Sequence, residues 1–230
     1  MIVHTSVIIP VHNGERFLGD AMSSVLSQLH ESDRLLVVDD GSTDATPAVA
    51  AAFRDPRVAR LRTSGLGVSA ARNLGLAAAT GDFVAFLDHD DMWPPSRHEV
   101  MTSSLLAHPG IDAAFGRVRV RFEPGAYVPA GAEGLDGRHI CELVGTALYR
   151  RSVLKRIGGF AEDMQVREDA DFFLRLSEAG LRPLMCDVDG VIYRRHDSNT
   201  SNDEARIMLG VTEVIRRKLA RARDRSRMKA

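Results

Sequence analysis

The feature that most constrains the fold is an alternation of short apolar runs with stretches of helical spacing through the first 92 residues. Runs rich in Val, Ile and Leu are typical of buried strands. When such strands alternate with helices, they form a parallel sheet with helices on both faces. We therefore expect an α/β fold with a mostly parallel, Rossmann-like sheet. The expected strands lie at 5–11, within 34–44, at 58–63 and at 82–88, with helices at 15–28, 46–53 and 68–80 between them.

Acidic residues gather where two of these strands end. FVAFLDHDDMW (83–93) carries Asp88, Asp90 and Asp91 directly after an apolar run, and an Asp pair ends the second strand at 39–40. Ligands bind at the carboxyl ends of strands in such sheets. Carboxylates this close repel one another unless a cation meets them, although a solvated loop tip is the alternative. Because alternate residues of an extended segment point the same way, the D-x-D spacing presents two carboxylates that suit a divalent metal ion.

The second half of the chain is less regular. We expect a Gly- and Pro-rich loop over 123–139 and a closing pair of strands over 183–196. The other expected elements are helices over 94–108 and 167–180, a strand over 112–122, and a strand end with a short helix within 146–160. We find no internal repeat and no clear linker, and 230 residues suit one large domain.

Composition and charge argue against several classes of protein. A net charge of −1 leaves no global field to recruit nucleic acid. Cys141 and Cys186 lie far apart without CxxC spacing, which argues against a disulfide framework or a zinc site and fits the reducing cytoplasm. No apolar run approaches the ~20 residues that a transmembrane helix needs. The N-terminal residues are expected to form a first strand and not a signal peptide.

Six segments together carry a resemblance to a known family. In chain order they are SVIIPVHNGERFL, VVDDGSTD, GVSAARNLGL, FVAFLDHDDMW, GGFAEDMQVREDADFFLRL and YRRHDSNTS. They resemble the family-2 inverting glycosyltransferases of the GT-A fold over roughly residues 3 to 200. The resemblance implies a nucleotide-diphosphate sugar donor, with a UDP-sugar favoured, and a Mn²⁺ or Mg²⁺ ion. It also implies one catalytic domain over 1–202, with a nucleotide-sugar-binding half (1–92) and an acceptor-side half (93–202).

The resemblance assigns roles to the metal-binding and catalytic residues. Asp90 is expected to bind the metal directly, and His196 to complete the metal site or contact the pyrophosphate. Asp169 is expected to be the general base that takes the proton of the acceptor hydroxyl, with Glu168 as the adjacent acid. Both acids lie at the start of an expected helix, where the helix dipole favours negative charge. The alternative is therefore that they only stabilise the first turn of that helix.

The resemblance also implies a nucleotide-binding side. Asp40 is expected to accept a hydrogen bond from a uracil-type imide, with helix capping as the alternative. Arg72 is expected to contact the base or the diphosphate, with an exposed helix residue as the alternative, and Asp88 to lie toward the donor sugar or ribose. The full set expected on this side is Pro10, Val11, Asn13, Glu15, Asp40, Arg72, Asp88 and His89.

The acceptor side is expected around Trp93, Glu142 and Gly145, although lone aromatic residues more often belong to a core. These residues do not identify the acceptor, which can be a carbohydrate, a lipid-linked molecule or a natural product. No QxxRW motif of the kind found in processive polysaccharide synthases follows His196. That absence favours an enzyme that adds a single sugar.

Two other functions fit parts of the pattern. A non-catalytic module that binds a nucleotide sugar would need none of the acids at 40, 88, 90 and 169, which are all present. A sugar nucleotidyltransferase shares the sheet and the metal, but it would carry a Gly-rich loop after the first strand. PVHNGERF (10–17) stands there instead.

The C-terminal residues 203–230 are expected to form a helix that breaks into a basic tail. Eight cationic residues and one acid, Asp224, lie between Arg216 and Lys229. This excess predicts peripheral contact with an anionic membrane at its inner face, and a frayed, solvated helix end is the alternative. Apolar residues of the preceding helix, including Leu209, Ile215 and Leu219, are expected to pack on the body of the protein.

Overall fold

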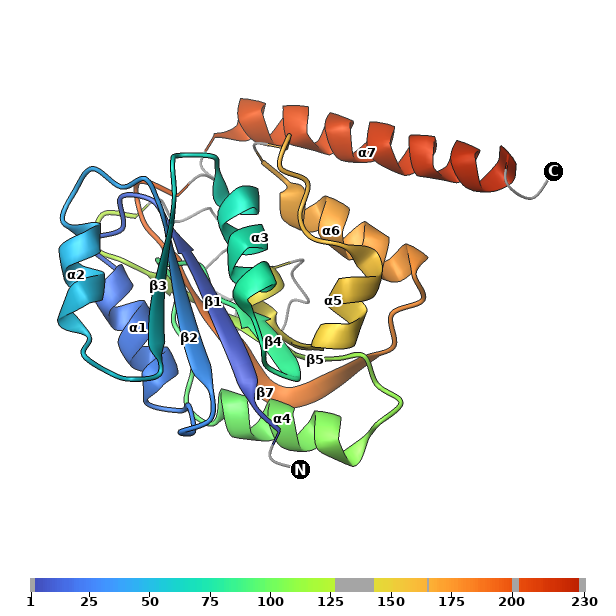
Figure 1. Cartoon of the computed structure of the whole chain (residues 1–230). Helices are drawn as coiled ribbons and strands as arrows, with labels where there is room; N and C mark the ends of the chain where they lie inside the picture. The colour runs from blue at the N-terminus through green and yellow to red at the C-terminus, as the bar shows by residue number, and fades with distance from the viewer. Residues whose placement is uncertain (1–2, 127–142, 165, 200–202, 228–230) are drawn as a thin grey trace.

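A seven-stranded sheet runs through the protein, with strand order β3-β2-β1-β4-β6-β5-β7 (Figure 1). The computed structural model describes residues 3–126, 143–164, 166–199 and 203–227. The strands are β1 Thr5–Val11, β2 Arg34–Asp40, β3 Val58–Thr63, β4 Phe83–Phe86, β5 Ala113–Phe122, β6 Ala147–Arg150 and β7 Pro183–Arg195. The helices are α1 Leu18–Leu26, α2 Thr46–Ala52, α3 Val68–Ala78, α4 Arg97–Ala107, α5 Arg151–Ile157, α6 Glu168–Glu178 and α7 Glu204–Arg227, with a 3-10 turn at Val144–Thr146.

The sheet is mostly parallel, as the sequence predicts. β1 pairs in parallel with β2 and β4, β2 with β3, and β5 with β7. β6 is antiparallel to both of its neighbours, β4 and β5. The sheet continues across residue 92, because β4 pairs with β6 of the second half. The carboxyl ends of β1, β2, β4 and β7 therefore reach the same rim of the sheet.

The expected pair of strands over 183–196 is wrong, because β7 is one continuous strand beside β5. The register between β5 and β7 shifts on either side of Arg117. Next to this irregularity the two backbones approach so closely that a Cβ on Gly116 would lie 2.5 Å from the backbone nitrogen of Gly190. Gly116 and Gly190 therefore permit the close approach of two paired strands, and Gly190 does not form a turn.

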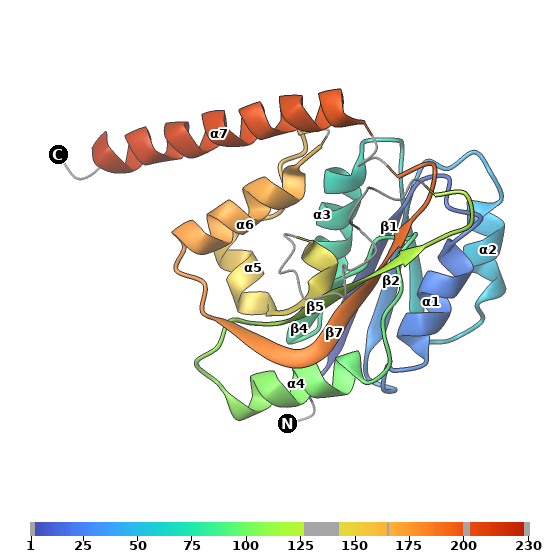
Figure 2. The same cartoon turned by 180° about the vertical axis from the view of Figure 1, so that it is seen from behind.

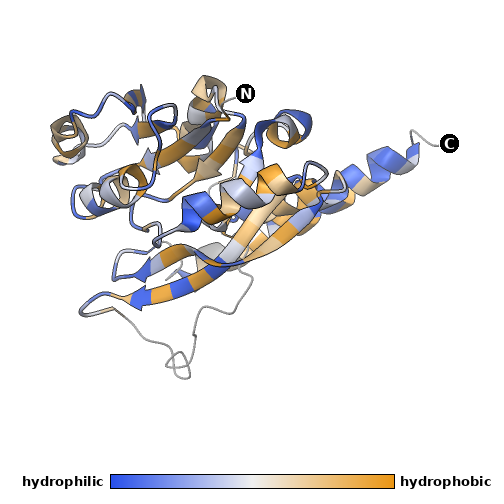
Figure 3. Ribbon diagram, turned by 90° about the horizontal axis from the view of Figure 1, so that it is seen from below, coloured by the Kyte–Doolittle hydropathy of each residue, from blue (hydrophilic) through white to orange (hydrophobic). Residues whose placement is uncertain are grey.

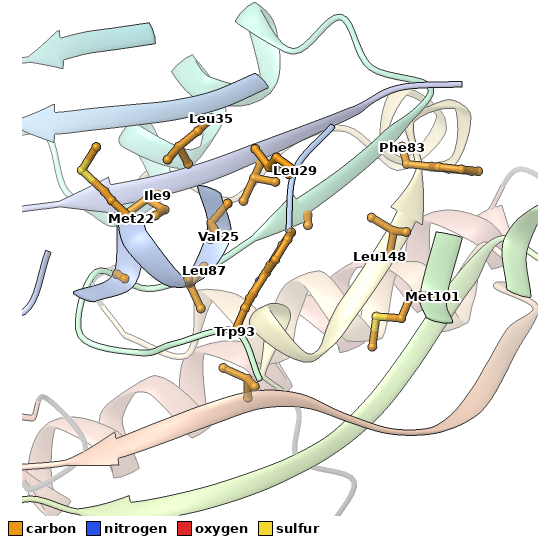
Figure 4. Close-up of a cluster of buried hydrophobic side chains, with 14 of the residues drawn as sticks. Ile9, Met22, Val25, Leu29, Leu35, Phe83, Leu87, Trp93, Met101 and Leu148 are labelled. Atoms are coloured by element: carbon orange, nitrogen blue, oxygen red, sulfur yellow. The ribbon is translucent and has the colours of Figure 1, made fainter. Parts of the chain in front are cut away.

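Two apolar layers hold the helices on the sheet. Val7 and Ile9 point to one face of β1 and contribute to a cluster with α1, α2 and α4, whereas Ile8 points to the other face and joins a cluster with α3, α5 and α6. Figure 4 shows part of the first cluster, and Figure 3 shows hydrophobic residues concentrated in the strands. Both faces of the sheet are thus covered, which is why the first strands read as continuous apolar runs.

The C-terminal segment differs from the expected helix that breaks into a basic tail. α7 continues through the basic residues to Arg227. It lies across α6, and its C-terminal end extends past the body of the protein (Figures 1 and 2). Within the described ranges, no helix is both long enough and apolar enough to cross a membrane.

Candidate active site

A cavity of about 500 Å³ opens at the rim where the parallel strands end. Both halves of the chain contribute to its walls, from the ends of β1, β2 and β4 and from the start of α6. The predicted residues that line it are Pro10, Val11, Asp40, Arg72, Asp88, His89, Asp90, Glu168 and Asp169. The structure therefore brings together most of the residues that were predicted for the nucleotide, the metal and the catalytic base.

Arg72 joins two of these segments. Its side chain is 4% exposed, and its Nη1 and Nη2 atoms each donate a 2.6 Å hydrogen bond, to Glu168 Oε1 and to Asp88 Oδ1 respectively. Burial alone would lower the pKa of the Arg72 guanidinium, but the two carboxylates outweigh burial and raise it. The alternative, that Arg72 is an exposed residue of a helix, is therefore wrong. In this structure the guanidinium binds carboxylates of the protein, and it fixes the end of β4 against the start of α6.

The start of α6 holds the two acids of the predicted catalytic pair. Arg167, which precedes them, has a left-handed backbone (φ 61°), an uncommon conformation for a residue with a side chain. Burial, and then the negative charge of Glu168, raise the pKa of Asp169 to about 6, although the charge of Arg72 acts in the opposite direction. A carboxylate with a pKa in this range is suited to accept a proton near neutral pH.

Asp90 lines the cavity and contacts His196, which comes from a distant part of the chain and is not among the residues that line the cavity. His196 Nε2 lies 3.0 Å from Asp90 Oδ2, and Ser198 Oγ lies 3.0 Å from the other ring nitrogen of His196. The His196 side chain is 5% exposed, and that of Asp90 is 18% exposed. A hydrogen-bonded second nitrogen is typical of a metal-binding histidine, because it fixes the orientation of the ring.

The donor set fits a metal that is shared with a substrate. Among the residues that the structure describes, no group of three or more His, Cys, Asp or Glu side chains gathers to hold a metal ion. Mg²⁺ and its relatives are often held by one or two carboxylates together with substrate phosphates. One carboxylate at the wall of an open cavity, with one imidazole beside it, fits that arrangement and does not fit a structural metal site.

Asp91 and Arg194 support the loop that carries Asp90. Asp91 Oδ1 accepts a 2.9 Å hydrogen bond from the backbone N–H of Arg194. Arg194 is buried, binds Asp20 Oδ2 at 2.8 Å, and donates through Nε to the carbonyl of Asp90. Burial and the neighbouring acids raise the pKa of Asp91 well above its ordinary value. These contacts fix the position of the acidic loop relative to β7.

On the nucleotide side, Asp40 organises the loop that leads into α3. Its carboxylate accepts hydrogen bonds from the hydroxyl of Thr63, from Leu66 N at 2.8 Å and from Gly67 N at 2.7 Å. Burial alone would raise the pKa of Asp40, but these donors outweigh it and lower the pKa. The carboxylate also lines the cavity, so one residue shapes the loop and faces the space available to a ligand.

Capping falls on neighbouring acids. Asp39 Oδ1 accepts the N–H of Ser42 at 2.9 Å, and Asp44 Oδ1 accepts the N–H of Thr46 at 2.9 Å at the start of α2. Asn13 and Glu15 bind the same turn through the N–H groups of Thr43 and Ala45. They are not among the residues that line the cavity, and in this structure they connect the ends of β1 and β2.

Two of the three predicted acceptor residues, Trp93 and Gly145, are buried and do not line the cavity. Trp93 is 2% exposed, belongs to the first apolar cluster and stacks on His98 at 5.6 Å between ring centroids, so it is a core residue in this structure (Figure 4). Gly145 is buried, and its carbonyl accepts a 3.1 Å hydrogen bond from Arg97 Nη2. Glu142 lies outside the described residues.

Besides Arg167, three polar residues that the sequence did not single out also line the cavity. They are His12, Tyr193 and Asn199. His12 Nδ1 lies 2.8 Å from the carbonyl of Asp40, and Asn199 Oδ1 accepts the N–H of His196 at 2.6 Å. Each lies close to the carboxyl end of β1 or β7, so the strand-end rule that selected Asp40 and Asp90 could also have found them.

Comparison with known proteins agrees with this architecture. The sequence model of "Glycosyl transferase family 2" matches residues 6–158. An uncharacterized glycosyltransferase of Rickettsia conorii is 34% identical over 180 residues, which are 75% of this chain and 30% of that protein. The glucosyltransferase WfgD of Escherichia coli is 39% identical over 102 residues, which are 44% of this chain and 40% of that protein. The chain thus spans less than half the length of these two relatives.

Solved structures share the fold. The crystal structure of S. aureus TarS 1–349 has a TM-score of 0.67 at 24% identity, and the match covers 84% of this chain and 60% of that one. The mannosyltransferase PcManGT of Pyrobaculum calidifontis, solved with GDP-Man and Mn²⁺, has a TM-score of 0.61 at 22% identity, over 82% of this chain and 57% of that one. With a sheet and helices like those of glycosyltransferases and a family match over more than half of its length, the chain belongs to glycosyltransferase family 2.

Proposed function

We propose that the protein transfers a sugar from a nucleotide-diphosphate sugar to an acceptor hydroxyl by a single displacement that inverts the anomeric carbon, and that a divalent metal takes part. The observation that carries this proposal is that Asp169, the Asp88–Arg72–Glu168 bridge and Asp90 line one open cavity, and that His196 contacts Asp90 from behind the cavity wall. Such a cavity offers a base and a metal-binding carboxylate to one substrate, and the Arg72 bridge holds the segments that carry them together.

The chemistry follows from the positions of these residues. Asp169 takes the proton of the acceptor hydroxyl while that oxygen attacks the anomeric carbon and the bond to the diphosphate breaks. Asp90 and His196 would hold the metal, which would neutralise charge on the leaving diphosphate. Arg72 keeps Glu168 and Asp88 in place, and its charge keeps the pKa of Asp169 from rising further.

The donor is proposed to be a UDP-sugar bound through Asp40 and its loop. TarS has been solved with UDP and with UDP-GlcNAc, and the name of WfgD gives UDP-Glc as its donor. WfgD is also named for a diphosphoundecaprenol-linked acceptor, which supports a lipid-linked acceptor for this chain. The enzyme would then act at the cytoplasmic face of a membrane. PcManGT, solved with GDP-Man, makes a GDP-sugar the second donor to test.

Hydrolysis of donors in the absence of acceptor tests the proposal. We expect the purified protein to release nucleoside diphosphate slowly from one member of a panel of UDP- and GDP-sugars, because water can replace the acceptor hydroxyl. Release should require Mn²⁺ or Mg²⁺ and should stop when the metal is chelated. Nucleotide binding without release from any donor, even with candidate acceptors added, would favour a non-catalytic binding module.

Replacing Arg72 tests the bridge. Arg72→Met leaves the buried Glu168 carboxylate without its cation, so we expect the free energy of unfolding to fall by about 3 kcal/mol. We also expect kcat/KM to fall and its acidic limb to shift to higher pH, because Arg72 lowers the pKa of Asp169. Arg62→Met, at an exposed arginine on β3, is the matched control. If Arg72→Met kept the wild-type stability and pH profile, the bridge would have no role in the site.

A further inference from the structure

α7 packs on the body through a face that carries arginines as well as Val214. Gly210, Val214, Arg217 and Arg221 are spaced by four, three and four residues, so they share one side of the helix. Arg221 Nη1 binds Asp171 Oδ1 at 2.7 Å, and its Nε binds Glu178 Oε2 at 2.9 Å. Arg217 pairs with an acid of the body as well, and Val214 is 8% exposed.

The opposite side of α7 is apolar and exposed, which corrects the expectation that the apolar residues pack on the body. Met208, Ile215 and Leu219, spaced by seven and four residues, form a stripe along the helix. They are 64%, 53% and 54% exposed, and the adjacent Leu209 is 73% exposed. These four residues are more than half of the seven exposed large hydrophobic side chains in the described part of the chain. The apolar surface is therefore concentrated on one helix.

Basic residues flank the stripe. Lys218, Arg223 and Arg227 are exposed and form no ion pair with any described residue. By helical spacing Lys218 lies on one side of the stripe, and Arg223 and Arg227 lie on the other. An apolar strip with cations on both sides matches the boundary between acyl chains and anionic headgroups. It does not match a second copy of the same helix, because two such faces would bring like charges together.

α7 also touches the residues next to the catalytic pair. At Gly210 the helix approaches so closely that a Cβ would lie 2.7 Å from Val166 Cγ2 and 2.9 Å from Arg167 Cγ. Val166 and Arg167 line the cavity and directly precede Glu168. A surface that binds α7 would therefore lie near the entrance for an acceptor.

We propose that α7 is an interfacial helix that binds the surface of an anionic lipid bilayer, with the stripe of Met208, Ile215 and Leu219 buried in it and the flanking basic residues on the headgroups. We take the lipid-linked nature of the acceptor from the proposed function. The helix would then bring the cavity to the surface from which such an acceptor extends.

Vesicle flotation of the full chain tests this inference. We expect the protein to float with vesicles of phosphatidylcholine and phosphatidylglycerol (7:3), and much less with pure phosphatidylcholine or at high salt. Leu219→Glu should weaken binding about tenfold or more, because it removes a buried leucine and adds a charge. The matched control is Ala220→Glu, which adds the same charge at the next residue, off the stripe, and should weaken binding much less.

Three outcomes would overturn the inference. Two of them are equal loss of binding in the two variants and no binding by the wild type. The other is a wild-type dimer by sedimentation equilibrium that Leu219→Glu dissociates, because a second copy would then cover the stripe. Calorimetric titration of UDP with Mn²⁺ in the same samples separates this result from the proposed function. Intact UDP binding without vesicle binding rejects the membrane role alone.

Discussion

Asp169→Asn is expected to lower the rate of sugar transfer by about 10³-fold, within the range contributed by a general base. The amide has the same size and keeps the side chain in place, but it cannot accept the proton of the acceptor hydroxyl. Donor affinity should stay close to that of the wild type, because the loss affects the transition state and not the bound donor. Single-turnover transfer with saturating donor, beside calorimetric titration of UDP, measures the two effects separately.

The pH dependence provides a second readout of the same residue. A base must be deprotonated to act, and the pKa of Asp169 is raised to about 6. Wild-type kcat/KM should therefore fall as the pH drops through about 6, and this limb should be absent in Asp169→Asn. Asp187→Asn, at a carboxylate that is 92% exposed, is the matched control and should leave both rate and profile unchanged. Near wild-type transfer by Asp169→Asn would exclude this base and make Glu168 the candidate.

The first half of the sheet could be predicted because its sequence signals are local. Each of β1, β2 and β4 is an apolar run followed at once by polar residues, and the rule that ligands bind at strand ends brings Asp40 and Asp90 to one rim. Neither step needs a partner that is distant in the sequence. The same rule applied to β7 could have found Asn199.

The contacts of Arg72, Trp93 and α7 could not be predicted in the same way. Arg72 lies 16 residues from Asp88 and 96 from Glu168, so its role depends on how the chain returns to the rim. Trp93 follows the acidic motif directly, yet it is buried against His98 of α4. An arginine-rich face is read as solvated unless Asp171 and Glu178 are known to lie beneath it. In each case the role of the residue depends on the residue that it contacts, which its own type does not reveal.

Asp90→Ala is expected to abolish the contribution of metal to donor binding. The Asp90 carboxylate is the acidic oxygen ligand beside His196, and hard divalent ions prefer such oxygens. In the presence of Mn²⁺, affinity for UDP should fall about 100-fold or more, to the value measured without metal. The fold should persist, because Asp90 is a loop residue whose side chain forms hydrogen bonds with His196 and Asn199 and does not belong to either apolar cluster of the described residues. Loss of one such hydrogen bond costs about 1 kcal/mol.

Asp197→Ala is the matched control, because it removes a carboxylate that lies next to His196 in sequence, is 77% exposed and faces Arg16. Titration of UDP with and without Mn²⁺ in wild type and both variants, beside thermal unfolding, separates loss of a ligand from loss of structure. Equal Mn²⁺ enhancement in Asp90→Ala and wild type would remove Asp90 from the metal site. Equal loss in Asp90→Ala and Asp197→Ala would instead indicate that the general negative charge of the rim attracts the ion. If Asp90 is a direct ligand, its replacement must weaken metal binding more than replacement of Asp197, although both carboxylates lie near the same histidine.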